Sequence, residues 1–167
     1  MMIFKIRKNL FALPEDYVVK TSIGEPLCKI AKIRQGYYIY NKVGAQIAQV
    51  VFSKHGAKLS VASSRPAFPG AINLVCYGKN RFEFEPYKLE KDDQQYVDQL
   101  KGKNTPAYSI WGDTVAYNFD IYYGKDIAAN IVPCLDDPDR YQIRMHDQGN
   151  LLVVLMILLA TEYFNAK

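Results

Sequence analysis

A run of ten apolar residues at 151–160, near the end of the chain, constrains the fold more than any other feature of the sequence. A helix built from this run has no polar face, so lipid or protein must surround it on every side. Ten helical residues rise only about 15 Å, which is half of the roughly 30 Å core of a bilayer. We therefore expect no transmembrane span, and instead a helix over about 149–164 that is buried by the chain's own strands and capped near Asp147 or Asn150.

The remainder of the chain is typical of short β-strands, because Tyr, Phe, Ile and Val are frequent and alternate with polar residues between turn signals. Residues 90–105 are polar and charged, and they predict either a long loop or a short exposed helix around 96–100. Outside the repeat described next, strands are predicted at 3–8, 57–62, 72–77, 82–89, 107–111 and 141–145.

A faint internal repeat combines an alternating strand, a turn that contains glycine, and a second strand. It occurs three times, with the turn glycine at Gly24, Gly44 and Gly124. Each copy predicts a β-hairpin, and the glycine is required if that turn position has a positive φ. Repeated hairpins favour a β-meander or a β-barrel.

These elements together predict a single mainly β domain over residues 1–167. A helix that is apolar on every face is best buried along the axis of a barrel, and a barrel of this size needs something to fill it. We therefore expect a closed antiparallel β-barrel of about twelve strands that encloses the hydrophobic C-terminal helix.

The cysteines and the N-terminus indicate a cytoplasmic protein. The three cysteines, Cys28, Cys76 and Cys134, are odd in number and none are close in sequence, which favours reduced thiols over a disulfide framework. Residues 1–14 lack the long apolar segment and the small-residue cleavage site of a signal peptide.

The chain resembles the tubby C-terminal-domain-like superfamily, which includes LURP-one-related proteins and phospholipid scramblases, and it is most similar to the small stand-alone bacterial members. The resemblance rests on the repeated hairpin, on the final strand 141–145, and on the stretch 150–164 entered through the polar turn 146–149. It implies a twelve-stranded antiparallel barrel around a hydrophobic C-terminal helix.

The resemblance also implies a lipid partner, because tubby proteins bind phosphoinositide headgroups through basic residues. Residues 1–60 carry 10 Lys and Arg against 3 Asp and Glu, whereas residues 61–167 carry 11 against 14. An anionic partner could use the basic half, although outward strand residues are often charged only for solubility and edge protection. The candidate residues for binding anionic phospholipid headgroups are Lys5, Arg7, Lys8, Lys29, Lys32 and Arg34.

These six residues form one patch only if neighbouring strands bring them together. Lys29 and Lys32 point to opposite faces of a strand without a bulge.

An acidic segment precedes the final helix, as it does in the calcium-responsive scramblases. The stretch holds Asp137, Asp139 and Asp147, but it lacks the calcium loop of a helix–loop–helix site. Asp136, Asp137 and Asp139 are weak candidates for a metal site, and the alternative is a solvated turn around Pro138.

Most signatures of catalysis or cofactor binding are absent from the sequence. His55 and His146 are the only histidines and no Cys-x-x-Cys pair exists, which argues against zinc. No Gly-x-Ser-x-Gly motif and no glycine-rich phosphate loop occurs, so we expect no cofactor. The modest positive charge and the aromatic residues, including Trp111, are weak support for nucleic acid as a partner.

The sequence therefore favours a non-catalytic, cytoplasmic binding protein that docks peripherally on anionic phospholipid at the inner membrane surface. The alternatives are a structural or protein–protein interaction module without a lipid role and, third, an enzyme of unknown class. Glu162 on the last helical turn is expected to emerge from the barrel mouth, and the alternative is a buried, partnered carboxylate.

Overall fold

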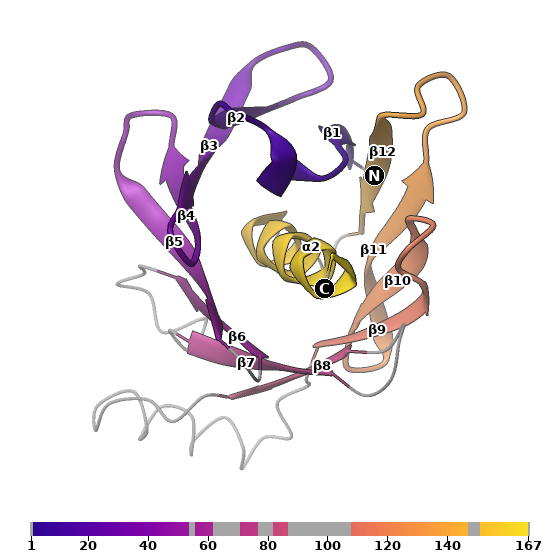
Figure 1. Cartoon of the computed structure of the whole chain (residues 1–167). Coiled ribbons are helices and arrows are strands. Elements are labelled where there is room, and N and C mark those ends of the chain that lie inside the picture. Colours follow the sequence, from indigo (N-terminus) through magenta and orange to yellow (C-terminus); the bar gives the residue numbers. More distant parts are fainter. Residues whose placement is uncertain are drawn as a thin grey trace.

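The computed structural model describes residues 2–53, 56–61, 71–76, 82–86, 108–146 and 151–166 of the chain. The C-terminal helix lies in the middle of the molecule and a single antiparallel sheet curls around it (Figure 1). The predicted mainly β class with a C-terminal helix is confirmed. Twelve strands and two helices are described, with the bounds β1 Met2–Arg7, η1 Leu10–Ala12, β2 Tyr17–Lys20, β3 Pro26–Ile33, β4 Gly36–Asn41, β5 Gln46–Ser53, β6 Gly56–Val61, β7 Ala71–Cys76, β8 Phe82–Pro86, β9 Tyr108–Asp113, β10 Asn118–Tyr123, β11 Asp126–Pro133, β12 Arg140–Met145 and α2 Leu151–Asn165.

Each strand pairs with its neighbours in the chain, except that β1 pairs with β12. The order therefore runs from β1 through β12 and back down the chain to β2, which leaves β1 and β2 as the two edge strands. Within the described residues no backbone ladder joins β1 to β2, so the predicted closed barrel is corrected to a curled sheet that is open at one place. We call this opening the seam.

The physical reason for the open seam lies in β2 and its first residue. β2 has only four residues, and the Tyr17 hydroxyl accepts a hydrogen bond from the Arg7 N–H, at 3.2 Å, where a backbone carbonyl would otherwise pair. A side chain thus substitutes for part of the missing ladder.

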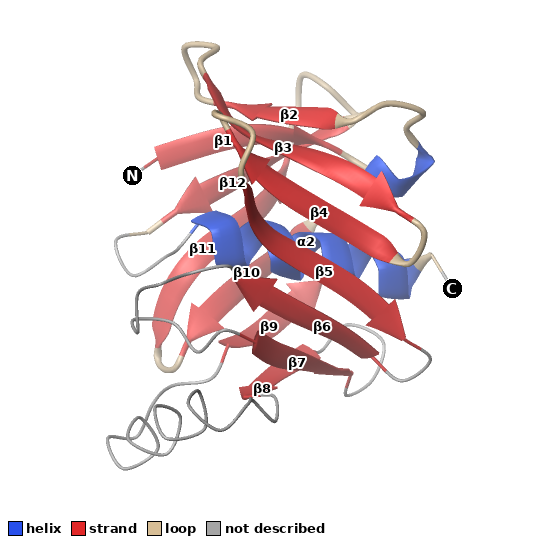
Figure 2. Cartoon of the chain, turned by 90° about the vertical axis from the view of Figure 1, so that its left-hand side faces the viewer, coloured by secondary structure: helices blue, strands red, loops and turns tan. Residues whose placement is uncertain are grey.

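The alternating strands define two ends of the sheet, because successive antiparallel strands run in opposite directions. The proximal end holds the start of α2 and the turns 21–25, 41–45 and 124–125. The distal end holds the end of α2, the link 8–16 and the loop 134–139. Figure 2 shows the N-terminus and the C-terminus at these opposite ends.

The core forms between α2 and the inward residues of the strands. Ten consecutive residues of α2, 153–162, are buried, as the apolar run predicts. Alternate strand residues meet them, such as Ile6 on β1 and Ile143 on β12. Neither described helix is long and apolar enough to cross a bilayer.

The three predicted hairpins are present, and their glycines have the expected backbone. The φ angles of Gly24, Gly44 and Gly124 are 87°, 88° and 64°. Each hairpin also carries one unpaired residue shortly after the turn, at Leu27, Ile47 and Ala128, which is a β-bulge. The repeat therefore extends to the irregularities of the sheet.

The two cysteines with described side chains agree with the expected reduced thiols, and several other predictions fall outside the described residues. Cys28 and Cys134 are buried and free, and burial raises the pKa of the Cys28 thiol to about 11, which keeps it protonated. The side chain of Cys76 and residues 54–55, 90–105 and 147–150 lie outside the described residues, so predictions that concern them, including those for His55, Asp147 and the helix cap, have no structural counterpart here.

Candidate functional site

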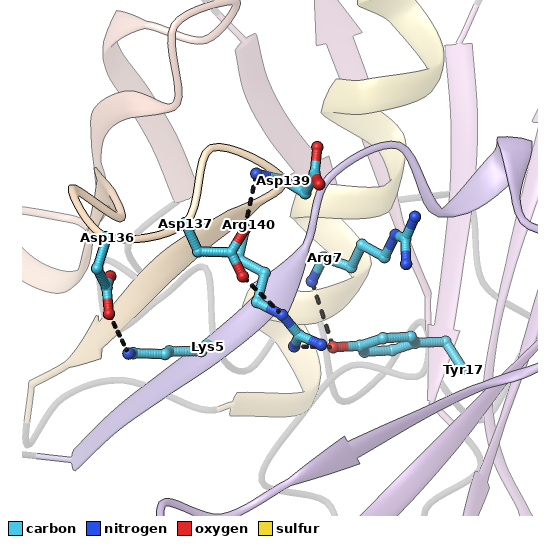
Figure 3. A network of polar contacts seen from close by, with 7 residues as sticks. All are labelled: Lys5, Arg7, Tyr17, Asp136, Asp137, Asp139 and Arg140. Carbon is cyan, nitrogen blue, oxygen red and sulfur yellow. Dashed lines mark hydrogen bonds and ion pairs between the residues drawn. The ribbon is translucent and has the colours of Figure 1, made fainter.

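The seam brings together side chains from β1, β2 and β12 (Figure 3). Tyr17 stands at its distal end, where its hydroxyl accepts from the Arg7 N–H and, at 3.4 Å, from Arg140 Nη1. This phenol therefore ties β12, β1 and β2 to one another.

Along β1, the backbone N–H and C=O groups of every second residue point toward the seam. The Lys8 N–H donates to the Asp139 carbonyl at the β12 side, whereas the Arg7 N–H donates to Tyr17 at the seam side. Because the direction alternates along an antiparallel strand, the N–H and C=O groups of Ile3 and Lys5 also point to the seam. No described backbone group pairs with them.

The same alternation applies to β2. The Thr21 N–H donates to the Glu25 carbonyl, which closes the hairpin with β3. Tyr17 and Val19 therefore turn their backbone groups to β3, and Val18 and Lys20 turn theirs to the seam. Two unpaired strand edges thus face one another.

A groove of about 550 Å³ lies over the seam, and we call it the seam groove. Its volume is in the range of about 300–1,000 Å³ that small-molecule sites occupy. Among the described residues, three cationic side chains and a phenol line it, and no carboxylate does. The lining residues are Ile3, Lys5, Tyr17, Val18, Lys20, Thr21, Ser22, Gly24 and Arg140.

The charges of the groove are only partly balanced by neighbouring carboxylates. Lys5 Nζ lies 3.4 Å from Asp136 Oδ2, and Arg140 Nε lies 3.3 Å from Asp137 Oδ2. All four side chains are substantially exposed, so each ion pair contributes only about 0–1 kcal/mol and an anion could displace it. Among the described residues no carboxylate pairs with Lys20.

The six predicted headgroup-binding residues do not form one patch. Lys5 lines the groove, and Arg7 follows on the same exposed face of β1. Lys8 lies 5.1 Å from the centre of the Tyr117 ring. Lys29 faces outward beside Asp16, at 3.8 Å.

The other two predicted residues, Lys32 and Arg34, lie at the distal end of β3. Lys32 Nζ donates to the Phe11 carbonyl at 2.7 Å, and Arg34 is exposed in the turn after the strand. The structure therefore does not bring the six residues together, because alternation along β3 separates Lys29 from Lys32.

Sequence reasoning missed Lys20, Arg140 and Tyr17 as residues of the same site. Lys20 follows the buried Val19 and so had an outward position that alternation could have identified. The approach of Arg140 and Tyr17 depends on how the two edges of the sheet meet, and no local pattern carries that information.

The acidic segment contacts cations of the groove. Asp136 and Asp137 face Lys5 and Arg140, and Asp137 Oδ1 also accepts from the Asp139 N–H at 3.0 Å. Within the described residues no three His, Cys, Asp or Glu side chains gather where they could hold a metal ion. The segment therefore has the contacts of a turn that balances neighbouring charge.

A second polar cluster lies inside the sheet at the distal end. Glu162 is buried, and its Oε2 accepts from the Asn9 N–H and, at 3.1 Å, from the Tyr117 hydroxyl. Its Oε1 is buried, and no group in the described part of the chain forms a hydrogen bond with it. The expectation that Glu162 emerges into solvent is wrong, because the link 8–16 and the turn before β10 cover it.

The backbone at this cluster is unusual. Asn9 and Tyr117, with φ of 57° and 55°, are the two non-glycine residues of positive φ in the described chain. Burial raises the pKa of Glu162 to about 7, against hydrogen bonds from Asn9 and Tyr117 that lower it. Burial and the nearby carboxyl also raise the pKa of Tyr37 and Tyr117 well above the usual range, so both phenols stay neutral.

The chain matches no known family profile and no curated protein sequence. It is similar to an X-ray structure of a protein from Arabidopsis thaliana, with a TM-score of 0.58 and 9% sequence identity. The similarity covers 94% of this chain and 88% of the plant protein. At this identity the likeness concerns the fold alone.

Proposed function

We propose that this chain is a non-catalytic binding protein whose seam groove takes the headgroup of an anionic phospholipid at a membrane surface. The observation that carries the proposal is the lining of the groove, to which Lys5, Lys20 and Arg140 contribute three cations. Asp136 and Asp137 pair with two of them through exposed ion pairs that an anion could displace, and no carboxylate of the described residues pairs with Lys20. A basic residue at an anionic membrane surface contributes about 1 kcal/mol, so three together supply a useful share of peripheral binding.

The chemistry of the lining supports a phosphate-bearing ligand. Arg140 offers a planar fork of donors, and the two lysines offer compact charges that can approach a phosphate from other sides. The Tyr17 hydroxyl adds a polar group at the distal end of the groove.

The resemblance to the tubby C-terminal-domain-like superfamily supports the same proposal, because basic residues bind phosphoinositide headgroups there. We place this curled sheet with the twelve-stranded barrels of that superfamily as part of the proposal, and we propose a cytoplasmic location at the inner membrane surface. The packing of α2 supports a non-catalytic role, because its side chains occupy the interior that a substrate would need.

Vesicle co-sedimentation tests the proposal with one matched pair of variants. We expect the wild type to bind vesicles of phosphatidylcholine with phosphatidylserine, and not phosphatidylcholine alone. Lys20→Glu reverses one charge in the groove, whereas Arg34→Glu makes the same change at the exposed distal turn.

Lys20→Glu is expected to weaken binding about tenfold or more, and Arg34→Glu to change it little, since about 1 kcal/mol per charge acts at short range. Equal losses in both variants, or no dependence on phosphatidylserine in the wild type, would overturn the proposal.

A second candidate function, a protein-interaction module, is favoured by the unpaired backbone of the seam. An extended peptide can add as a strand to an exposed edge such as that of β2. Val18→Pro discriminates between the two, because its N–H points to the seam and proline is tolerated on an edge strand. Loss of a protein partner with unchanged vesicle binding would favour the interaction module.

A further inference from the structure

Two hairpin tips at the proximal end carry large apolar side chains in solvent. Ile23 and Val43 are each 79% exposed, at equivalent positions in the first two copies of the repeat. Isolated exposed apolar residues are common on protein surfaces. Two exposed apolar residues at the same position of neighbouring turns form a pattern. The structure of the turns does not require them.

The turns are held by other residues. In the first, the Thr21 hydroxyl accepts from the Glu25 N–H at 3.1 Å. In the second, Asn41 Oδ1 accepts from the Val43 and Ala45 N–H groups at 3.1 and 2.9 Å. Polar residues and glycine are favoured at such positions, so the β-branched side chains have no structural role there.

The two hairpins that end in these tips are neighbours on the sheet. β3 and β4 are paired, so the two hairpins are neighbours, and their centres are about 10 Å apart at the usual strand spacing. Ile23 lies between Ser22 and Gly24, which both line the seam groove. The apolar tips therefore continue the groove toward the proximal end.

The charges near the tips favour an anionic surface at the proximal end over the distal end. Lys20 precedes the first tip and Lys42 lies within the second turn, with Glu25 the one carboxylate in these two hairpin turns. At the distal end, the fully exposed Leu135 stands beside Asp136, Asp137 and Asp139. Lys5 and Arg140 pair with the first two of these carboxylates, and Lys32 and Arg34 lie elsewhere at that end on β3 and the turn after it, so the contrast concerns the immediate surroundings of the exposed apolar residues.

We propose that Ile23 and Val43 are membrane anchors that insert into the interfacial region of an anionic bilayer and orient the proximal end toward it. This inference rests on the proposed headgroup binding in the seam groove. The β2–β3 hairpin then carries both Lys20, which contacts the headgroup, and Ile23, which inserts into the bilayer. This arrangement places the groove at the level of the lipid phosphates.

The test compares two double variants on vesicles of phosphatidylcholine with phosphatidylserine. Ile23→Ser/Val43→Ser removes the anchors, and Val115→Ser/Leu135→Ser removes exposed apolar side chains at the distal end. Serine is favoured in turns, so both proteins should fold, and their melting temperatures check this. We expect the first variant to bind at least tenfold more weakly and the second to bind like the wild type.

A tryptophan at the tip supplies a second readout. In Ile23→Trp, the added fluorescence should shift to shorter wavelength on vesicles and be quenched by lipids brominated in the acyl chain, relative to the wild type with its single Trp111.

The outcomes separate the two proposals. If Lys20→Glu weakens binding while Ile23→Ser/Val43→Ser does not, the anchors are refuted and the headgroup site stands. If both apolar variants lose affinity equally, the proximal orientation is refuted. If the wild type shows no dependence on phosphatidylserine, the headgroup site fails, and with it the anchors.

Discussion

Glu162 is a carboxyl group buried in the core at the distal end of α2. A buried carboxyl with one unpartnered oxygen favours its neutral form, and its pKa of about 7 compares with 4.5 when it is exposed. The free energy of unfolding therefore falls as the pH rises from about 4.5 through about 7, because the carboxyl group ionises first in the unfolded chain. Below about 4.5 both states are protonated and the penalty vanishes.

Glu162→Gln should remove this penalty. We expect the variant to gain stability relative to the wild type as the pH rises from 4 to 8, by about 3 kcal/mol at most, since one pKa unit corresponds to about 1.4 kcal/mol. Thermal melts of both proteins across this range measure the difference. A difference that does not change with pH would show that Glu162 is not protonated in the folded protein.

The hairpin glycines supply a second residue-scale prediction. At Gly44 a Cβ would meet no atom within 4 Å, so the cost of a side chain there comes from the backbone alone. Gly44→Val should destabilise the protein by about 1–2 kcal/mol, because the left-handed conformation is strained for residues other than glycine. Chemical denaturation measures it, and an unchanged midpoint would contradict the assignment of φ.

At the scale of elements, α2 was predictable because its apolarity leaves no other placement. Ten consecutive buried residues allow no orientation toward solvent, and the strands of a small sheet offer the surroundings that such a helix needs. The hydrogen bonds that Glu162 of α2 accepts from Asn9 and Tyr117 were not predictable, since those residues come from distant parts of the chain.

Leu155→Asp tests the central position of the helix. Leu155 is 2% exposed, and an unpaired charge in the core costs several kcal/mol against a total stability of about 5–15 kcal/mol. We expect no cooperative melting for this variant, whereas Leu155→Met, of similar volume, should fold. A soluble Leu155→Asp protein that melts cooperatively would contradict burial of α2.

The strands and hairpins followed from alternation and glycine, but the seam did not. Local pattern places β1 as a strand with Lys5 outward, and the structure agrees. Whether β1 and β2 pair depends on the twist accumulated over the whole sheet and on the Tyr17 side chain. The predicted closure was wrong for this reason.

At the scale of the whole molecule, the uneven charge of the sequence pointed to an anionic partner without locating the site. Lys5 and Lys20 of the groove belong to the basic N-terminal part of the sequence, whereas Arg140 belongs to the acidic remainder. Pairing of β1 with β12 brings Lys5 and Arg140 together, and the approach of the β1 and β2 edges at the seam adds Lys20. A count of charge along the chain could not find such a site.

The most direct test of the central claim, headgroup binding in the seam groove, is a titration of isotope-labelled protein with a monomeric short-chain phosphatidylserine. We predict saturable amide shifts at Lys5, Val18 and Lys20, little change at Arg34, and no such response to short-chain phosphatidylcholine. Shifts that gather elsewhere, or that both lipids cause equally, would contradict the account.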